Sequence, residues 1–152
     1  MNILVTLPMA EAQRMDLEQI DPGANYQYTK YKSVTRELVQ EANIIIGNVP
    51  PEFIEGSANL EWLQLNSAGT DGYCNPGVLA EGTILTNASG AYGLSIGEFM
   101  VGLTFALKKN TALYVRNQIN HRWHYESGVS TIMGSTVLVI GLGDIGMEYA
   151  KR

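Results

Sequence analysis

Cysteine is nearly absent from this sequence, since Cys74 is the single one among 152 residues. One cysteine cannot close a disulfide within the chain, which excludes a disulfide-stabilised scaffold and fits a reducing compartment, so we expect a cytoplasmic protein. Histidine is almost as rare, with only His121 and His124. No cluster of Cys, Asp or Glu lies near them in the sequence to complete a metal site, and we expect surface or interface positions for both.

Charged residues and long apolar runs are scarce as well. Charged residues make up 16% of the chain and the net charge is −5, which argues against nucleic acid and anionic membranes as partners. The longest apolar run, residues 99–107, is too short to span a bilayer and favours a buried helix. Met1 leads directly into a strand-like run, so no signal peptide is expected.

What the sequence does contain is an alternation of short apolar runs and helical patterns. This alternation predicts an α/β fold in which helices cover both faces of a parallel sheet. Strands are expected at residues 2–6, 26–30, 43–47, 62–65 and 83–86, and helices at residues 10–20, at 35–40 with Thr35 as the cap, and from near Glu52. The five strands would complete one small domain.

A long helical region is expected after this domain, over residues 91–120, with one break near Lys109 and Asn110. A loop at 128–134 then leads to a buried strand at residues 136–140, which is followed by the opening of another helix. A lone strand and helix cannot bury both faces of a parallel sheet. We therefore expect this last segment to pack on the long helix or on another chain, or to be disordered.

Residues 141–146 read Gly-Leu-Gly-Asp-Ile-Gly and carry the clearest chemical signal. In a strand–turn–helix context, Gly141 permits a tight turn, Gly143 allows the backbone to approach a pyrophosphate, and Gly146 allows the helix to pack on the strand. The positive end of the helix dipole favours the negative charge of the phosphates. The pattern predicts a dinucleotide-binding turn, although a plain turn without a ligand uses the same residues.

Four segments in order resemble the N-terminal half of the D-isomer-specific 2-hydroxyacid dehydrogenases. They are Leu65–Asp71 with its Gly-x-Asp core, Thr86–Gly90 with Ile96-Gly97-Glu98, Trp123 with Met133-Gly134, and Val137–Gly141 running into the glycine turn. The resemblance covers the whole chain. It implies a flavodoxin-like parallel-sheet domain that binds substrate, at residues 1–95. The truncated start of a Rossmann-like nucleotide-binding domain, with the long crossover helices, would occupy residues 96–152.

The resemblance also implies an activity, which is the NAD- or NADP-dependent interconversion of 2-hydroxy acids and 2-keto acids by hydride transfer. Backbone amides of Ser67, Ala68 and Gly69 would hold the substrate carboxylate, as turn amides do for anions generally. The cofactor would lie on the turn formed by Gly141, Gly143, Asp144, Ile145 and Gly146. Helices over residues 92–125 would build a homodimer.

The family's catalytic arginine, glutamate and histidine fall beyond Arg152, and so does the acidic residue that would bind the ribose. We therefore expect the chain as written to be a fragment that does not catalyse hydride transfer and that binds little cofactor by itself. Two other functions stay open. One is a nucleotide-sensing binding module of the corepressor type on the same fold, and the other is an inert structural fragment.

Several single residues have a structural interpretation beside a functional one. Asp144 departs from many relatives, and we expect it to face solvent or to cap the following helix. Glu98 lies in an otherwise apolar helix, and we expect its carboxylate to make a structural hydrogen bond rather than to act as an acid or base. We expect Asp71 to act as a structural cap. We expect Tyr73 and Cys74 to lie in the core or on the surface rather than in a substrate cleft.

Overall fold

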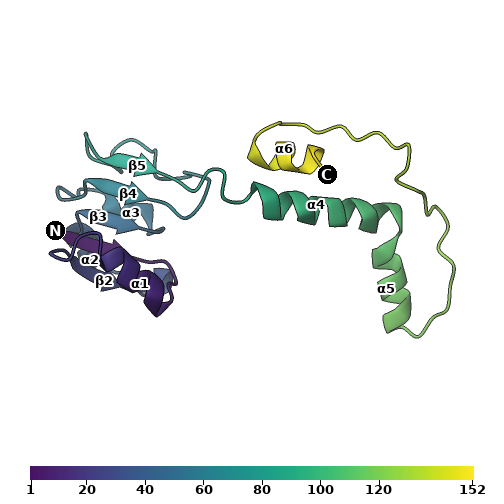
Figure 1. Ribbon diagram of the computed structural model, residues 1–152, viewed down its shortest axis with the longest axis horizontal. Helices are drawn as coiled ribbons and strands as arrows, with labels where there is room; N and C mark the ends of the chain where they lie inside the picture. Colours follow the sequence, from purple (N-terminus) through teal and green to yellow (C-terminus); the bar gives the residue numbers. More distant parts are fainter. The chain divides into compact units, whose positions relative to one another are not determined.

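The computed structural model describes residues 1–152, and it divides into two units, Met1–Ser89 and Gly90–Arg152 (Figure 1). The assignment of residues 1–95 to substrate binding and of 96–152 to the cofactor domain stays a prediction. None of the helices in either unit combines the length and the apolar character that a bilayer crossing requires.

The first unit is a five-stranded parallel sheet with helices packed on it, as the alternating pattern predicts. The strands are β1 (Asn2–Val5), β2 (Asn25–Tyr28), β3 (Ile44–Ile46), β4 (Trp62–Gln64) and β5 (Ile84–Thr86). The helices are α1 (Glu11–Glu18), α2 (Arg36–Glu41) and α3 (Pro51–Ile54), with a 3-10 turn η1 (Tyr31–Ser33). The strand order is β2-β1-β3-β4-β5, which is the flavodoxin-like order, and this confirms the predicted fold class.

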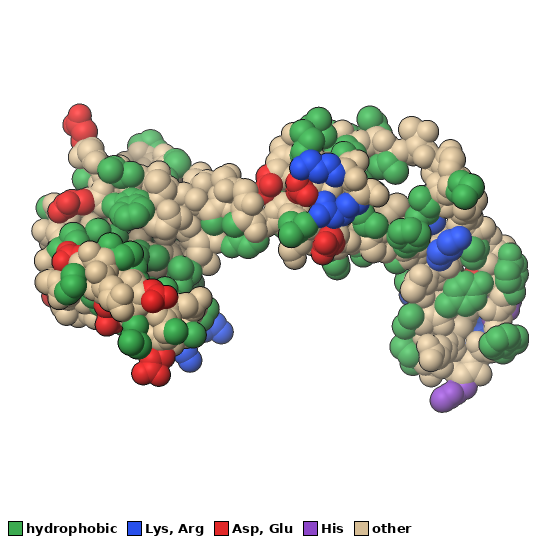
Figure 2. Space-filling model, viewed as in Figure 1, with side chains coloured by type: hydrophobic (Ala, Val, Ile, Leu, Met, Phe, Trp, Pro, Cys, Tyr) green, Lys and Arg blue, Asp and Glu red, His purple; other side chains and the backbone are tan.

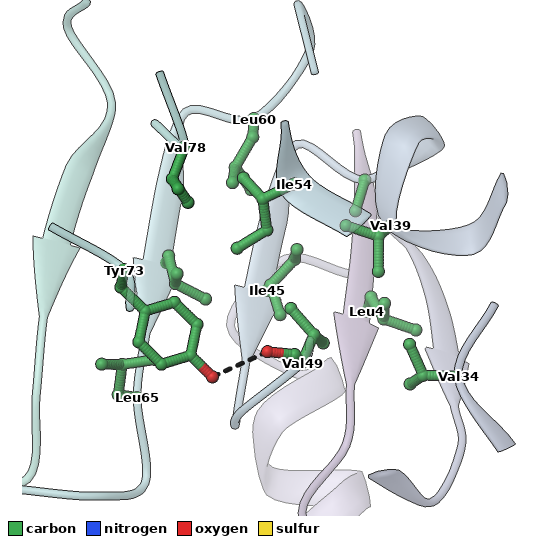
Figure 3. Close-up of a cluster of buried hydrophobic side chains, with 12 residues drawn as sticks. Leu4, Val34, Val39, Ile45, Val49, Ile54, Leu60, Leu65, Tyr73 and Val78 are labelled. Carbon is green, nitrogen blue, oxygen red and sulfur yellow. Dashed lines mark hydrogen bonds between the residues drawn. The ribbon is translucent and has the colours of Figure 1, made fainter. Parts of the chain in front are cut away.

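The register of the sheet aligns one apolar row across four strands. Leu4 lies beside Ile45, Ile45 beside Leu63, and Leu63 beside Leu85. The side chains of Leu4, Ile45 and Leu63 are fully buried or nearly so, and truncating such a leucine to alanine costs about 2–5 kcal/mol. Val39 from α2 packs in the same cluster, which Figure 3 shows.

Local signals explain where the short helices of this unit begin. Thr35 has extended backbone angles and its side chain accepts a hydrogen bond from the amide of Leu38 at 3.4 Å, so the predicted cap of α2 is confirmed. Pro51 occupies the first turn of α3, where its missing amide hydrogen costs nothing. Both features favour a first helical turn at the residues where the two helices begin.

The second unit contains three helices, α4 (Gly93–Lys108), α5 (Thr111–Ile119) and α6 (Asp144–Ala150). The predicted break is confirmed at Asn110, whose left-handed φ of 52° ends the path of α4 and starts α5. Helix α6 packs on α4, where Gly97 leaves room for the backbone of Glu148 and Tyr149. The hydroxyls of Thr104 and Tyr149 share a hydrogen bond of 2.6 Å across this contact.

The buried strand predicted at residues 136–140 is wrong. This segment has no strand pairing, and it follows the long extended path between α5 and α6 in Figure 1. Leu138 is 83% exposed and Ile140 is 92% exposed. The physical reason is that a strand exists only through hydrogen bonds to a neighbouring strand, and the second unit contains no other strand. The apolar sequence of the segment alone therefore does not bury it.

Candidate functional site

The substrate segment predicted from the sequence lies at the carboxyl edge of the parallel sheet, directly after β4. In open α/β sheets, ligands bind in the crevice outside the carboxyl ends of the strands. Asn48, which follows β3, and Asn66, which follows β4, lie side by side there. The backbone amide of Asn48 donates to the side-chain oxygen of Asn66 at 2.9 Å, and the amide of Asn66 donates back to Asn48 at 3.0 Å. This reciprocal pair fixes the start of the loop that contains Ser67.

The loop of residues 67–69 is held through its oxygen atoms. The hydroxyl of Ser67 accepts from the Asn48 side chain at 3.1 Å and donates to the carbonyl of Gly69 at 2.7 Å. The side-chain amide of Asn87 donates to the carbonyl of Ala68 at 2.8 Å. By contrast, the backbone amides of Ser67, Ala68 and Gly69 donate to no acceptor within the chain. A rigid turn with consecutive open amides is suited to binding an anion.

This edge of the sheet is also held by a close contact between the ends of β1 and β3. Gly47 adopts a φ of 112°, and a side chain there would collide with the hydroxyl of Thr6. That hydroxyl donates to the carbonyl of Asn48 at 2.9 Å. Only glycine allows β1 and β3 to end this close together. The position of Asn48 therefore depends on the absence of a side chain at Gly47.

Tyr73 belongs to the core, as the structural interpretation of the sequence expects. Its side chain is buried, and its hydroxyl donates to the carbonyl of Val49 at 2.7 Å, the dashed line in Figure 3. Burial raises the pKa of the Tyr73 phenol above its usual value. The neighbouring Cys74 is an exposed free thiol, and Asp71 is exposed as well.

In the glycine turn of the second unit the expected helix is present as α6, but the expected strand before the turn is not. Gly141 has a φ of 92°, which disfavours any side chain. Gly143 precedes the first residue of α6, and Ile145 lies in the first turn of that helix. Gly146 is buried, and a Cβ atom there would collide with the carbonyl of Gly141. The turn is therefore so tight that only glycine fits at position 146, the third glycine of the motif.

Asp144 is the first residue of α6, is exposed, and makes no capping hydrogen bond. Its carboxylate lies directly against Gly93, at the first residue of α4, so a side chain at that position would displace it. Of the two expectations for Asp144, the exposed position is found and the capping bond is not. A carboxylate at the first turn of α4 interacts favourably with the positive end of that helix.

The remaining single residues lie on the surface of the second unit. Glu98 is exposed, and its carboxylate approaches the guanidinium of Arg152 at 4.0 Å, so it is not the buried carboxylate that would need a partner. His121 and His124 are both exposed and lie beside Trp123.

Sequence reasoning missed Asn48 and Asn87 as residues of the site. Asn48 follows the strand before the loop, and Asn87 follows the strand after it. Asn48 lies in no motif, and Asn87 lies in the family-like segment Thr86–Gly90 without a pattern that marks it as a site residue. The parallel register brings both to the loop, because it places the ends of neighbouring strands together. The signal that could have found them is a polar residue at the carboxyl end of each predicted strand.

No family model matches the chain. Among curated proteins, it is 24% identical over 144 residues to a putative 2-hydroxyacid dehydrogenase of Haemophilus influenzae, covering 86% of this chain and 46% of that protein. It is 26% identical over 157 residues to the D-3-phosphoglycerate dehydrogenase of Methanocaldococcus jannaschii, covering 99% of this chain and 30% of that protein. It is 25% identical over 158 residues to the glycerate dehydrogenase of Methylorubrum extorquens, covering 91% of this chain and 50% of that protein.

Solved structures show the same fold. The NAD-dependent formate dehydrogenase from Staphylococcus aureus, in complex with NAD, superimposes with a TM-score of 0.77 at 19% identity, over 100% of this chain and 53% of that one. A D-isomer specific 2-hydroxyacid dehydrogenase family protein from Aeromonas salmonicida gives 0.75 at 24% identity, over 98% of this chain and 48% of that one. The chain thus spans half or less of the curated relatives cited, and about half of these solved structures.

Proposed function

We propose a function from one premise, which is that the curated and structural neighbours of this chain consistently indicate the D-isomer-specific 2-hydroxyacid dehydrogenase family. The chain is part of an NAD- or NADP-dependent oxidoreductase that interconverts D-2-hydroxy acids and 2-keto acids. The activity belongs to a longer protein, of which this chain supplies the substrate-binding unit and the first turn of the cofactor domain.

The single observation that carries the proposal is the loop of residues 67–69. Its oxygen atoms are engaged by Asn48, by Asn87 and by the loop itself, while its consecutive amides stay open. A carboxylate accepts hydrogen bonds from such amides, and charge-assisted bonds of this kind are the stronger ones. In this proposal Ser67, Ala68 and Gly69 hold the carboxylate of the acid and so fix the orientation of its reacting carbon.

The glycine turn fits a nicotinamide dinucleotide. When bound, that cofactor supplies the hydride acceptor or donor. On this chain, Gly141 and Gly143 let the backbone approach the pyrophosphate, and Gly146 holds the turn closed because no Cβ atom fits there. Asp144 and Ile145 complete the turn, and the contact of the Asp144 carboxylate with Gly93 keeps that charge at the start of α4. The choice between NAD and NADP lies with residues outside the turn.

A homodimer through residues 92–125 is part of the same proposal. Large apolar side chains are exposed along α4 and α5, and Figure 2 shows green side chains on the visible face of this unit. They include Phe99, Leu107 and Ile119, and Trp123 follows α5. Soluble monomers rarely leave such patches uncovered. Sedimentation velocity of the chain tests this, and a strict monomer at all concentrations contradicts it.

The proposed activity is tested on a protein that contains this chain together with the rest of the cofactor domain. Oxidation of NADH and NADPH is followed with a panel of small 2-keto acids. The decisive variant is Gly69→Pro, which removes one loop amide hydrogen. It is expected to raise KM for the keto acid roughly 10- to 100-fold, the range expected for one charge-assisted bond. Binding of NADH should not change.

The matched control is Gly69→Ala, which keeps the amide. A Cβ atom at this position meets only the Asp71 carboxylate, at an ordinary contact distance of 3.6 Å. Equal KM values for the two variants would contradict the role of the amides. Nicotinamide binding without turnover on any keto acid would contradict the dehydrogenase and favour a nucleotide-sensing module.

A further inference from the structure

The first unit contains a crevice of about 970 Å³ whose basic side chains have no part in the carboxylate loop of residues 67–69. It lies outside the carboxyl ends of β1, β2 and β3, and its walls include Thr6, Arg14, Tyr28, Lys30, Lys32 and Asn48. The strand order reverses between β1 and β3, because the chain proceeds from β1 to β2 on one side and then to β3 on the other. Such a switch point is the place where open α/β sheets bind ligands.

Positive charge is concentrated in this crevice although the unit as a whole is acidic. The first unit has eleven Asp and Glu residues but only four basic side chains. Three of the four, Arg14, Lys30 and Lys32, line the crevice. In Figure 2 the red side chains are scattered over the first unit, while its blue ones gather at one margin. A strongly acidic unit that gathers its cations on one concave surface attracts anions there.

The fourth cation, Arg36, has a structural role that the other three lack. Its guanidinium donates to the carbonyls of Glu52 and Glu55, both at 2.9 Å, and so ties α2 to α3. Arg14, Lys30 and Lys32 form no ion pair and donate no side-chain hydrogen bond. Like charges that share one surface without carboxylate partners repel each other, and a bound anion would relieve this repulsion.

Arg14 is nevertheless held in place. Its guanidinium carbon lies 4.5 Å from the centre of the Tyr28 ring, a cation–π contact. The hydroxyl of Tyr28 donates to the Glu18 carboxylate at 3.0 Å. Glu18 is therefore engaged by a neutral phenol, and the Arg14 charge stays available at the crevice wall. An ordered cation without a carboxylate partner is what a site for an anionic ligand requires.

We propose that this crevice is a binding site for a small phosphate-bearing molecule. A doubly charged phosphate gains from three cations at once, whereas a single carboxylate would neutralise only one of them. The crevice would bind its ligand through cationic side chains, whereas the loop of residues 67–69 offers backbone amides. Asn48 lines the crevice and also donates to Ser67, so the two sites share one connecting residue. The proposal stands on the first unit alone and does not depend on dehydrogenase activity.

The test uses the 152-residue chain with a ¹⁵N label in 0.15 M NaCl, titrated separately with inorganic phosphate and with glycerol 3-phosphate. We expect saturable shifts of the amides at Arg14, Lys30 and Lys32 and no change in circular dichroism. Lys30→Gln combined with Lys32→Gln should weaken binding about tenfold, the effect of losing two exposed charge contacts. Arg14→Gln alone should weaken it by a smaller factor.

The matched control is Lys108→Gln combined with Lys109→Gln, which removes the same charge from the second unit and should leave binding unchanged. Tighter binding of glycerol 3-phosphate than of phosphate assigns the site to a phosphate ester, and equal affinities assign it to phosphate itself. The proposal is overturned by non-saturable shifts, by equal losses in the two double variants, or by shifts confined to residues 67–69.

Discussion

Asn48 and Asn66 each bind the backbone amide of the other through their side-chain oxygens, at 2.9 and 3.0 Å. The two residues follow β3 and β4, so the pair extends the parallel ladder beyond the last regular strand bond. It sets the position from which the loop of residues 67–69 leaves the sheet. The pair is therefore the structural connection between the core of the first unit and the proposed carboxylate site.

The first prediction concerns this pair. Asn66→Ala should lower the free energy of unfolding by about 1–2 kcal/mol, since the amide of Asn48 loses its acceptor. Asn48→Ala should also lower it, because the amide of Asn66 loses its acceptor and Ser67 loses the donor that lies at 3.1 Å. Urea unfolding of both single variants and of the double variant gives the coupling free energy between the two side chains.

The double variant should cost clearly less than the two single variants together, because both bonds belong to one ring. Asn59→Ala serves as the control, since the Asn59 side chain makes one bond to the carbonyl of Gln40, at 2.9 Å, and should add independently to Asn48→Ala. Strict additivity of Asn48→Ala and Asn66→Ala would show that the two bonds act separately.

The second prediction concerns the buried phenol. Tyr73→Phe should destabilise the first unit by about 1 kcal/mol, because the carbonyl of Val49 loses its donor inside the core. Tyr31→Phe removes a hydroxyl from an exposed ring and should change stability by no more than a few tenths of a kcal/mol. Thermal unfolding monitored by circular dichroism distinguishes the two, and equal effects would count against the Val49 bond.

The third prediction is a pH dependence at the same residue. Burial raises the pKa of Tyr73 above its usual 10.0, so the folded state favours the neutral phenol. Its contribution to stability is fully present below pH 10.0 and is lost as the pH rises toward the folded pKa. Stability of the unaltered chain should therefore fall more steeply above this pH than that of Tyr73→Phe. Parallel curves for the two proteins would contradict the raised pKa.

The fourth prediction compares two glycines of α4. A Cβ atom at Gly97 would lie 3.1 Å from atoms of Glu148 and Tyr149, whereas one at Gly102 would meet nothing within 4 Å. Gly97→Ala should therefore loosen α6 and speed hydrogen exchange of its amides. Gly102→Ala should stabilise α4 by about 0.5–1 kcal/mol, because it removes only the backbone freedom of a helical glycine. Unchanged exchange in Gly97→Ala would mean that the contact is readily rearranged.

Elements that depend on local sequence patterns could be predicted, whereas those that depend on contacts between distant segments could not. The five strands, the Thr35 cap and the break at Asn110 follow from local patterns, and all are found. Residues 136–140 have the same apolar character as the strand at Ile44–Ile46, yet only the latter is paired. A strand is a property of two segments, so a single segment cannot determine it.

The crevice illustrates the same limit in the candidate sites. Arg14 comes from α1, Lys30 precedes η1 and Lys32 lies within it. The distance in sequence between Arg14 and the two lysines does not reveal that all three line one crevice. Their convergence depends on the chain turning back beside β1 to place β2 at the edge of the sheet. The loop of residues 67–69, by contrast, is continuous in sequence, and this made it visible as a motif.

The strand order also limits which strand pairings are possible while the chain is being synthesised. β1 is the first strand to be synthesised, and it pairs with β2 on one side and with β3 on the other. All pairings are parallel and no two strands are joined as a hairpin, so each pairing requires that the crossover segment between the two strands has already been synthesised. During translation the edge of β1 that later faces β3 therefore stays unpaired until Ile46 has left the ribosome, and β5 is the last strand that can be added to the sheet.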